Sequence, residues 1–242
     1  MPATSRTITV LQLYSKDMNI YGDQGNVQVL TRRLRWHGYT PKLISYNPGD
    51  TFPSSIDLVI GGGGQDSGQK IIQQDLQNIK TKLTTLAENG TPMLMVCGLY
   101  QLFGHFFKTK EGEVIEGIGI LDIETHGGNE RLTGNIVTKN TLFGEIIGYE
   151  NHSGQTYLGK NVQPLGTVIR GAGNNGHDDT EGAIYKNVIG TYLHGSLLPK
   201  NPELADWLIE KAVTNKYGEF TPSVIDDRFA TEARKIARRR PR

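Results

Sequence analysis

A short apolar run that ends at the only cysteine is the clearest signal of the fold in this chain of 242 residues. Residues 93–96 have the sequence Met-Leu-Met-Val, typical of a buried strand, and Cys97 and Gly98 follow at once. The residues after Gly98 resemble the start of a helix. Such a strand-to-helix turn lifts a side chain out of a sheet and directs a helix N-terminus toward it. A buried cysteine that acts only as a small hydrophobe is the alternative. The turn favours a thiolate, so Cys97 is predicted to be a nucleophile.

Strands alternate with helices through the first half of the chain, which predicts an α/β fold with a parallel-rich sheet between helical layers. We expect strands at residues 7–13, 42–46, 57–60 and 93–96, and helices at residues 26–37 and 67–89. Ligand sites in such sheets form at the carboxyl ends of the strands. Cys97 and the four glycines at residues 61–64 both follow strand ends, so we expect them to share one site.

After about Gly112 the pattern changes to short strands and turns, which predicts antiparallel additions in the C-terminal half. Extended segments are expected at residues 131–138, 145–149, 167–170 and 188–192, and helices at residues 202–213 and 226–242. The sequence contains no internal repeat and no linker-like segment. We therefore expect residues 1–242 to form a single domain with a basic helix at its C-terminal end.

Composition excludes some classes of function. The chain has 26 basic and 25 acidic side chains, so its charge gives no global signal for nucleic acid. A single cysteine excludes an internal disulfide framework and fits a reducing cytosol. We expect no signal peptide, and no apolar run approaches the ~20 residues of a membrane span. These observations predict a cytoplasmic protein.

A cysteine nucleophile needs a nearby base, and His194 is the best candidate among six histidines. It follows the apolar extended run at residues 188–193 and precedes Gly195. His194 should therefore lie at a strand end, on the same edge of the sheet as Cys97. A lone histidine is more often structural, but the pairing with Cys97 favours a catalytic role.

The glycines at residues 61–64 are predicted to supply backbone donors for an oxyanion. They lack the Gly-Lys-Ser/Thr ending of a phosphate-binding loop, and their spacing does not fit a dinucleotide-binding turn. A flexible turn without function is the alternative. We favour an oxyanion role in which the N–H of Gly63 or Gly64 joins that of Gly98.

Together these motifs resemble those of the class I glutamine amidotransferases. The elbow from Cys97 to Gln101 has the form Cys-Gly-x-x-Gln found in that family, and residues 60–66 resemble its glycine-rich oxyanion turn. The chain is most similar to the cobyric-acid-synthase type, and within it to the glutaminase subunits of lipid II isoglutaminyl synthases of Gram-positive bacteria. The supporting stretches are residues 21–26, 131–134, 148–154 and 190–195.

The resemblance implies hydrolysis of L-glutamine to glutamate and ammonia by Cys97 and His194. It implies substrate-binding roles for Gly63, Gly64, Gly98, Gln101 and Arg131. One position departs from the family, because Ser196 stands where many members have a glutamate two residues after the histidine. The sequence therefore predicts a Cys–His dyad, or a third group that it does not identify.

Arg131 is also a candidate on chemical grounds. A guanidinium can offer two parallel N–H donors to the α-carboxylate of glutamine. Arg131 opens an expected strand after the flexible residues 127–129, where a loop can carry it over a pocket. A surface arginine at a hairpin is the alternative. Arg170 and Arg32 are rivals, but neither lies in a matching motif.

The chain has no ATP-binding motif, so a glutaminase of this size implies a separate synthetase that receives the ammonia. By resemblance this partner is a Mur-ligase-like subunit that uses ATP and Mg²⁺ to amidate the D-glutamate of lipid II to D-isoglutamine in peptidoglycan synthesis. No cofactor and no metal are expected in this chain. The alternatives are another acceptor such as a corrinoid, a catalytically idle binding module on the same fold, or a cysteine peptidase.

Three further segments of the sequence each allow two interpretations. Glu150 and His152 form a weak metal-ligand pair, for which a structural or interface role is favoured. Residues 21–26 form either a loop near the site or a partner, or a plain turn capped by Asn26. Residues 228–242 hold seven basic side chains and one acidic. This tail is either a solvated helix or a surface for a partner or an anionic membrane face. The resemblance implies a place at the inner face of the membrane through the partner and the lipid substrate.

Overall fold

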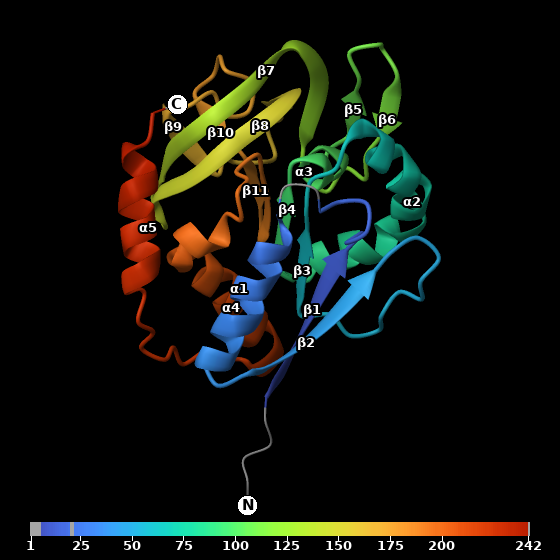
Figure 1. The fold of residues 1–242 in the computed structure, drawn as a ribbon. Helices are drawn as coiled ribbons and strands as arrows, with labels where there is room; N and C mark the ends of the chain where they lie inside the picture. Colours follow the sequence, from blue (N-terminus) through green and yellow to red (C-terminus); the bar gives the residue numbers. More distant parts are fainter. Residues whose placement is uncertain (1–5, 20–21, 242) are drawn as a thin grey trace, which may run out of the picture.

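Two β-sheets organise the residues that the computed structural model describes, 6–19 and 22–241 (Figure 1). The first sheet has the order β11-β12-β4-β3-β1-β2, and its neighbouring strands are parallel except for the antiparallel edge strand β11. Its strands are β1 (Thr7–Leu13), β2 (Thr40–Tyr46), β3 (Leu58–Gly61), β4 (Met93–Val96), β11 (Ala183–Tyr185) and β12 (Val188–Thr191). This sheet confirms the predicted parallel-rich α/β fold.

The central strands of the first sheet are buried on both faces. Every residue of β3, β4 and β12 is buried, which explains why these strands are continuous apolar runs rather than alternating ones. Helix α1 (Gln24–Trp36) packs against α4 (Pro202–Tyr217), while α2 (Asp66–Glu88) packs against the short helix α3 (Gly98–Leu102). The carboxyl ends of β3, β4 and β12 therefore meet at one edge of the sheet.

The second sheet forms the antiparallel-rich part expected in the C-terminal half. It has the order β10-β9-β7-β5-β6, and β8 pairs with β7. Its strands are β5 (Phe106–Lys108), β6 (Val114–Glu116), β7 (Ile123–Asn140), β8 (Gly144–Leu158), β9 (Gly166–Arg170) and β10 (Thr180–Glu181). A bridge between Tyr149 and His194 joins this sheet to the end of β12.

Several boundaries differ from the sequence prediction. The segments expected at residues 131–138 and 145–149 are parts of the much longer strands β7 and β8, and the hairpin β5–β6 was not predicted. Glycines and polar residues interrupt the alternation of apolar and polar side chains in these strands. The pairing of β7 with β8 also shifts register between Gly127 and Leu132. The expected helix at residues 202–213 continues to Tyr217, where Gly218 adopts a left-handed cap.

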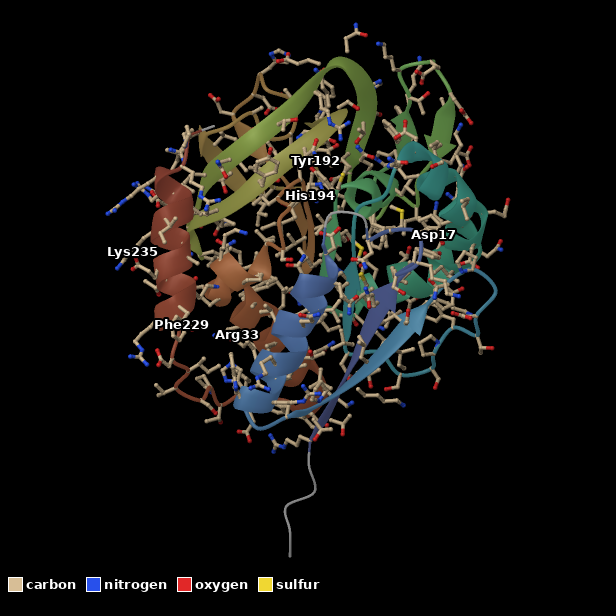
Figure 2. The ribbon with its side chains drawn as sticks, viewed as in Figure 1. Asp17, Arg33, Tyr192, His194, Phe229 and Lys235 are labelled. Atoms are coloured by element: carbon tan, nitrogen blue, oxygen red, sulfur yellow. The ribbon has the colours of Figure 1, made fainter. Side chains whose placement is uncertain are left out.

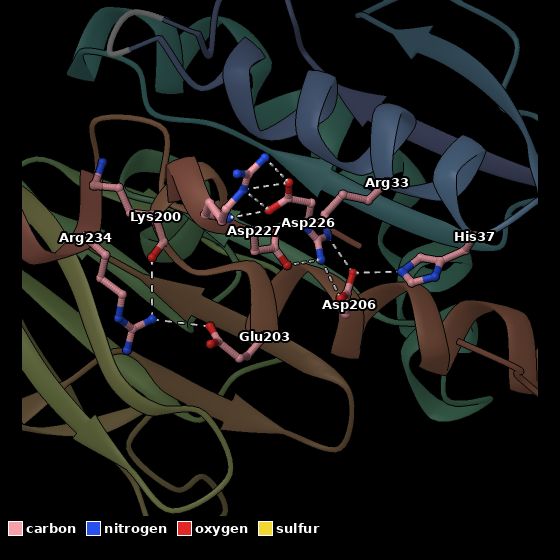
Figure 3. A network of polar contacts seen from close by, with 9 residues as sticks. Arg33, His37, Lys200, Glu203, Asp206, Asp226, Asp227 and Arg234 are labelled. Carbon is pink, nitrogen blue, oxygen red and sulfur yellow. Dashed lines mark hydrogen bonds and ion pairs between the residues drawn. The ribbon is translucent and has the colours of Figure 1, made fainter. Parts of the chain in front are cut away.

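A buried arginine holds the C-terminal segment against the body of the molecule. The Arg33 guanidinium donates to both carboxylate oxygens of Asp206 on α4 and of Asp227 before α5 (Figure 3). His37 lies 3.1 Å from the same Asp206 carboxylate. Burial by itself raises the pKa of Asp206, but its contacts with Arg33 and His37 outweigh burial and lower that pKa. Because unpairing a buried charge is costly, this cluster fixes α1, α4 and the start of α5 to one another.

Helix α5 (Arg228–Arg239) is the basic helix expected at the C-terminal end, although Arg242 lies outside the described residues. Arg238 pairs with Glu145 on β8. Arg234 pairs with Glu203, as Figure 3 shows. Phe229 and Lys235, both labelled in Figure 2, are exposed, and Phe229 lines a cavity together with Arg32 and Trp36 of α1. Two of the arginines of α5 therefore form ion pairs with acidic residues of this chain. Within the described residues, no helix has the length and apolar character that crossing a bilayer requires.

Candidate active site

Cys97 lies at the predicted strand-to-helix turn, between β4 and α3. Its backbone has φ 51° and ψ −106°, a positive-φ conformation that is uncommon for a residue with a Cβ. Its N–H donates to the carbonyl of Thr191 on the neighbouring strand at 2.9 Å, which anchors the turn to β12. Cys97 is only 6% exposed and lines a cavity. The strained turn therefore presents the thiol at the edge of the sheet.

His194 lies beside Cys97 because β12 and β4 are parallel neighbours, with Thr191 opposite Val96. Its backbone N–H donates to the carbonyl of Tyr149 on β8, so the residue lies where the two sheets meet (Figure 2). Burial by itself lowers the pKa of His194, but its contacts with Cys97 and Asp23 outweigh burial and raise the pKa to about 10. The environment thus stabilises an imidazolium next to the Cys97 sulfur.

Asp23 is a third member of this cluster that the sequence did not identify. It precedes α1, is 4% exposed, and places Oδ1 3.9 Å from Nδ1 of His194. Its other oxygen, Oδ2, accepts a hydrogen bond from the Gly63 N–H at 2.7 Å. Asp23 therefore connects the histidine to the glycine-rich turn. An acidic residue at the start of a helix, within residues 21–26, was the only signal that could have indicated it.

Ser196, at the position that differs from the family pattern, contacts the segment before α1 that also contains Asp23. It adopts φ 48°, and its Oγ donates to the carbonyl of Gly22 at 2.7 Å. The segment at residues 22–26 therefore lies next to the candidate site, and Asn26 accepts a hydrogen bond from the Leu198 N–H instead of capping α1. Tyr21 lies outside the described residues.

The glycine-rich turn brings one backbone donor close to the elbow. A Cβ on Gly98 would lie 3.2 Å from the backbone nitrogen of Gly64, so the two backbones approach closely. Gly63 differs from the prediction, because its N–H already donates to Asp23 and is not available to an oxyanion. Gly64 and Gly98 are the pair whose placement fits oxyanion donors.

The cavity in front of Cys97 has a volume of about 340 Å³, within the usual range of small-molecule sites. Arg131 lies at its wall, with Nε donating to the Asn151 side chain at 2.7 Å. Gln101 also lines it, but its amide is held in a buried network by Gln69 and Tyr192. The lining residues are Gly64, Gln65, Asp66, Ser67, Gln69, Cys97, Gln101, Phe107, Arg131, Asn151, His152, Ser153 and Gly154.

Glu150 and His152 have structural contacts rather than the geometry of a metal pair. The Glu150 carboxylate accepts the N–H groups of Ala172 and Gly173, and His152 stacks on the Tyr192 ring at 3.5 Å. Burial lowers the pKa of His152 to about 3, so its ring is neutral. Among the residues that the structure describes, no three His, Cys, Asp or Glu side chains are grouped to hold a metal ion.

Comparison with known proteins identifies glutamine amidotransferases and glutamine-hydrolysing subunits as the relatives of this chain. Residues 8–202 match the family described as the CobB/CobQ-like glutamine amidotransferase domain. The chain is 40% identical over 231 residues to the lipid II isoglutaminyl synthase (glutamine-hydrolysing) subunit GatD of Staphylococcus aureus, covering 95% of this chain and 94% of that protein. It is 37% identical over 217 residues to GatD of Streptococcus pneumoniae, covering 88% and 83%.

The fold is similar to that of solved glutamine amidotransferases. A glutamine amidotransferase from Thermotoga maritima superposes with a TM-score of 0.53 at 14% identity, covering 95% of this chain and 93% of that one. At this identity the likeness concerns the fold alone.

Proposed function

The chain belongs to the CobB/CobQ-like glutamine amidotransferase family, and on that premise we propose that it is the glutamine-hydrolysing subunit of a lipid II isoglutaminyl synthase. The observation that carries the proposal is the similarity to GatD subunits along most of the length of both proteins. The placement of Cys97 beside His194 at a cavity supports the same activity.

In the proposed reaction the Cys97 thiolate attacks the side-chain amide carbon of L-glutamine. The N–H groups of Gly64 and Gly98 stabilise the oxyanion, and a single donor of this kind contributes about 3 kcal/mol. Protonated His194 gives its proton to the departing nitrogen, so ammonia leaves and a thioester remains. Neutral His194 then removes a proton from water, which cleaves the thioester to glutamate and restores the thiolate–imidazolium pair.

Asp23 acts in this scheme as a positioning residue. Its carboxylate faces Nδ1 of His194 and stabilises the positive charge of the ring, while its bond to Gly63 fixes the glycine-rich turn. The same carboxylate thus orients both the base and the turn that carries the Gly64 N–H. Asp23 thus supplies the carboxylate that Ser196, two residues after His194, cannot provide.

The ammonia is proposed to pass to a separate Mur-ligase-like subunit. That partner would bind ATP and Mg²⁺ and amidate the D-glutamate of lipid II to D-isoglutamine. The word subunit in the names of both GatD relatives supports a complex. We place the complex in the cytoplasm, at the inner face of the membrane, where its lipid-linked acceptor and its ATP are both accessible.

Reconstitution tests this assignment. The purified chain should release ammonia from L-glutamine, and co-expression with the partner should give a single shifted peak in size-exclusion chromatography. The complex should amidate lipid II when ATP and glutamine are present, and neither subunit should do so alone. Amidation by this chain alone, or activity of the complex only on a corrinoid carboxylate, would contradict the proposal.

Arg131→Ala is expected to lower kcat/KM for L-glutamine by ~1.5–3 kcal/mol, or about 10- to 150-fold, the scale of a charge-assisted hydrogen bond. The reason is loss of the guanidinium that we propose for the α-carboxylate of the substrate. Arg131→Lys should recover only part of the loss, because an ammonium cannot form two parallel bonds. Steady-state ammonia release provides the measurement.

The matched control is Arg32→Ala, because Arg32 stacks on Trp36 of α1 and does not line the cavity. It should change kcat/KM by less than about twofold. If Arg131→Ala leaves the kinetics of the folded protein unchanged, the carboxylate of glutamine binds elsewhere.

A further inference from the structure

The cavity beside Cys97 contains an acidic side chain that the proposed reaction does not use. Among the described residues that line it, Asp66 is the one carboxylate and Arg131 the one guanidinium. From this pairing we infer that Asp66 binds the α-ammonium group of L-glutamine. The inference rests on the proposed function and identifies the residue that would select an α-amino acid over other primary amides.

The position of Asp66 is fixed relative to the nucleophile by the chain itself. It is the first residue of α2 and follows Gly64 by two positions, in the turn that approaches Gly98. The next turn of the helix is tied down, because the Gln69 N–H donates to the Gln65 carbonyl and the Gln69 side chain donates to Gln101. Asp66 is therefore carried on a rigid element at the cavity rather than on a mobile loop.

The two charged groups come from different walls of the cavity. Asp66 belongs to α2, on the side of the first sheet, whereas Arg131 belongs to β7 in the second sheet. The α-carbon of glutamine bears one ammonium and one carboxylate, at the end of the molecule opposite the reacting amide. When the amide carbon is placed at Cys97, a carboxylate on one wall and a guanidinium on the other match both substituents.

The surroundings of Asp66 leave its charge suited to a cationic ligand. Burial is the main influence on its carboxyl and raises the pKa, Glu111 raises it further, and Lys70 and Arg131 act in the opposite direction. Lys70 is paired with Glu113, so its charge is already shared with another carboxylate. A bound ammonium would offset the repulsion from Glu111 and stabilise the ionised carboxylate of Asp66.

The test compares L-glutamine with glutaramate, which has the same amide and carboxylate but no α-amino group. Asp66→Asn should raise KM for L-glutamine about 10-fold or more, the scale of an ionic hydrogen bond, with kcat changed less than about threefold. KM for glutaramate should stay within about twofold of the wild-type value. The preference for L-glutamine over glutaramate should therefore fall by about the same 10-fold.

Glu111→Gln is the matched control, since Glu111 contributes negative charge near Asp66 but does not line the cavity. It should leave both KM values within about twofold, and thermal melting should show that each variant is folded. If Asp66→Asn leaves KM for L-glutamine unchanged, or impairs both substrates equally, the assignment is wrong although the protein remains a glutaminase. If the wild-type protein releases no ammonia from L-glutamine, the proposed function itself fails.

Discussion

Cys97→Ala is expected to abolish ammonia release from L-glutamine, lowering kcat by on the order of 10⁴-fold or more, as for a lost nucleophile. No other cysteine is present to form the thioester. The fold should persist, because alanine keeps the Cβ and makes the same demand on the backbone at φ 51°. A coupled assay for ammonia, with circular dichroism of both proteins, provides the measurement.

Two controls separate chemistry from folding in this variant. A diazo ketone that mimics glutamine should add once to the wild-type protein and not to Cys97→Ala, as seen by intact mass. The complex that contains Cys97→Ala should lose amidation with glutamine but keep it with added ammonium salt, because the ligase step follows ammonia release. Substantial glutamine hydrolysis by the variant would exclude the thioester mechanism.

The parallel core and the position of Cys97 at a strand-to-helix turn could be predicted because their signals are local. The strands at residues 7–13 and 93–96 have the predicted boundaries, since buried parallel strands are short apolar runs with sharp ends. The elbow follows from the same signal, because Cys97 and Gly98 stand where such a run stops. The position of His194 shortly after β12 follows from the same kind of signal.

The rest of the site depends on contacts between segments far apart in the chain. Asp23 lies 171 positions before His194, and no periodicity in the sequence indicates that they meet. The bond from Gly63 to Asp23 likewise decides which glycine remains a free donor, so the sequence alone left Gly63 and Gly64 equivalent. The long strands β7 and β8 were underestimated because tertiary pairing overrides their glycines and polar residues.

His194→Ala is expected to lower kcat by at least ~100-fold, the low end for a lost general acid or base. The residue must deliver a proton to the leaving ammonia, and its pKa, raised to about 10 by Cys97 and Asp23 against burial, keeps it protonated at neutral pH. His105→Ala is the control, because His105 pairs with Asp122 and does not line the cavity. If His152→Ala lowers kcat as much as His194→Ala does, the assignment of His194 as the base loses its support.

The pH profile distinguishes a positioning role of Asp23 from a merely structural one. A raised pKa means that the imidazolium of His194 is present below that pKa and is lost as pH rises through it, so kcat should fall on the alkaline side. Asp23→Asn removes one of the negative charges that raise the pKa, and the alkaline limb should move to lower pH. Because asparagine can still accept the Gly63 N–H, the turn should keep its position. A lower kcat with an unmoved alkaline limb would show that Asp23 acts on the fold and not on the proton of His194.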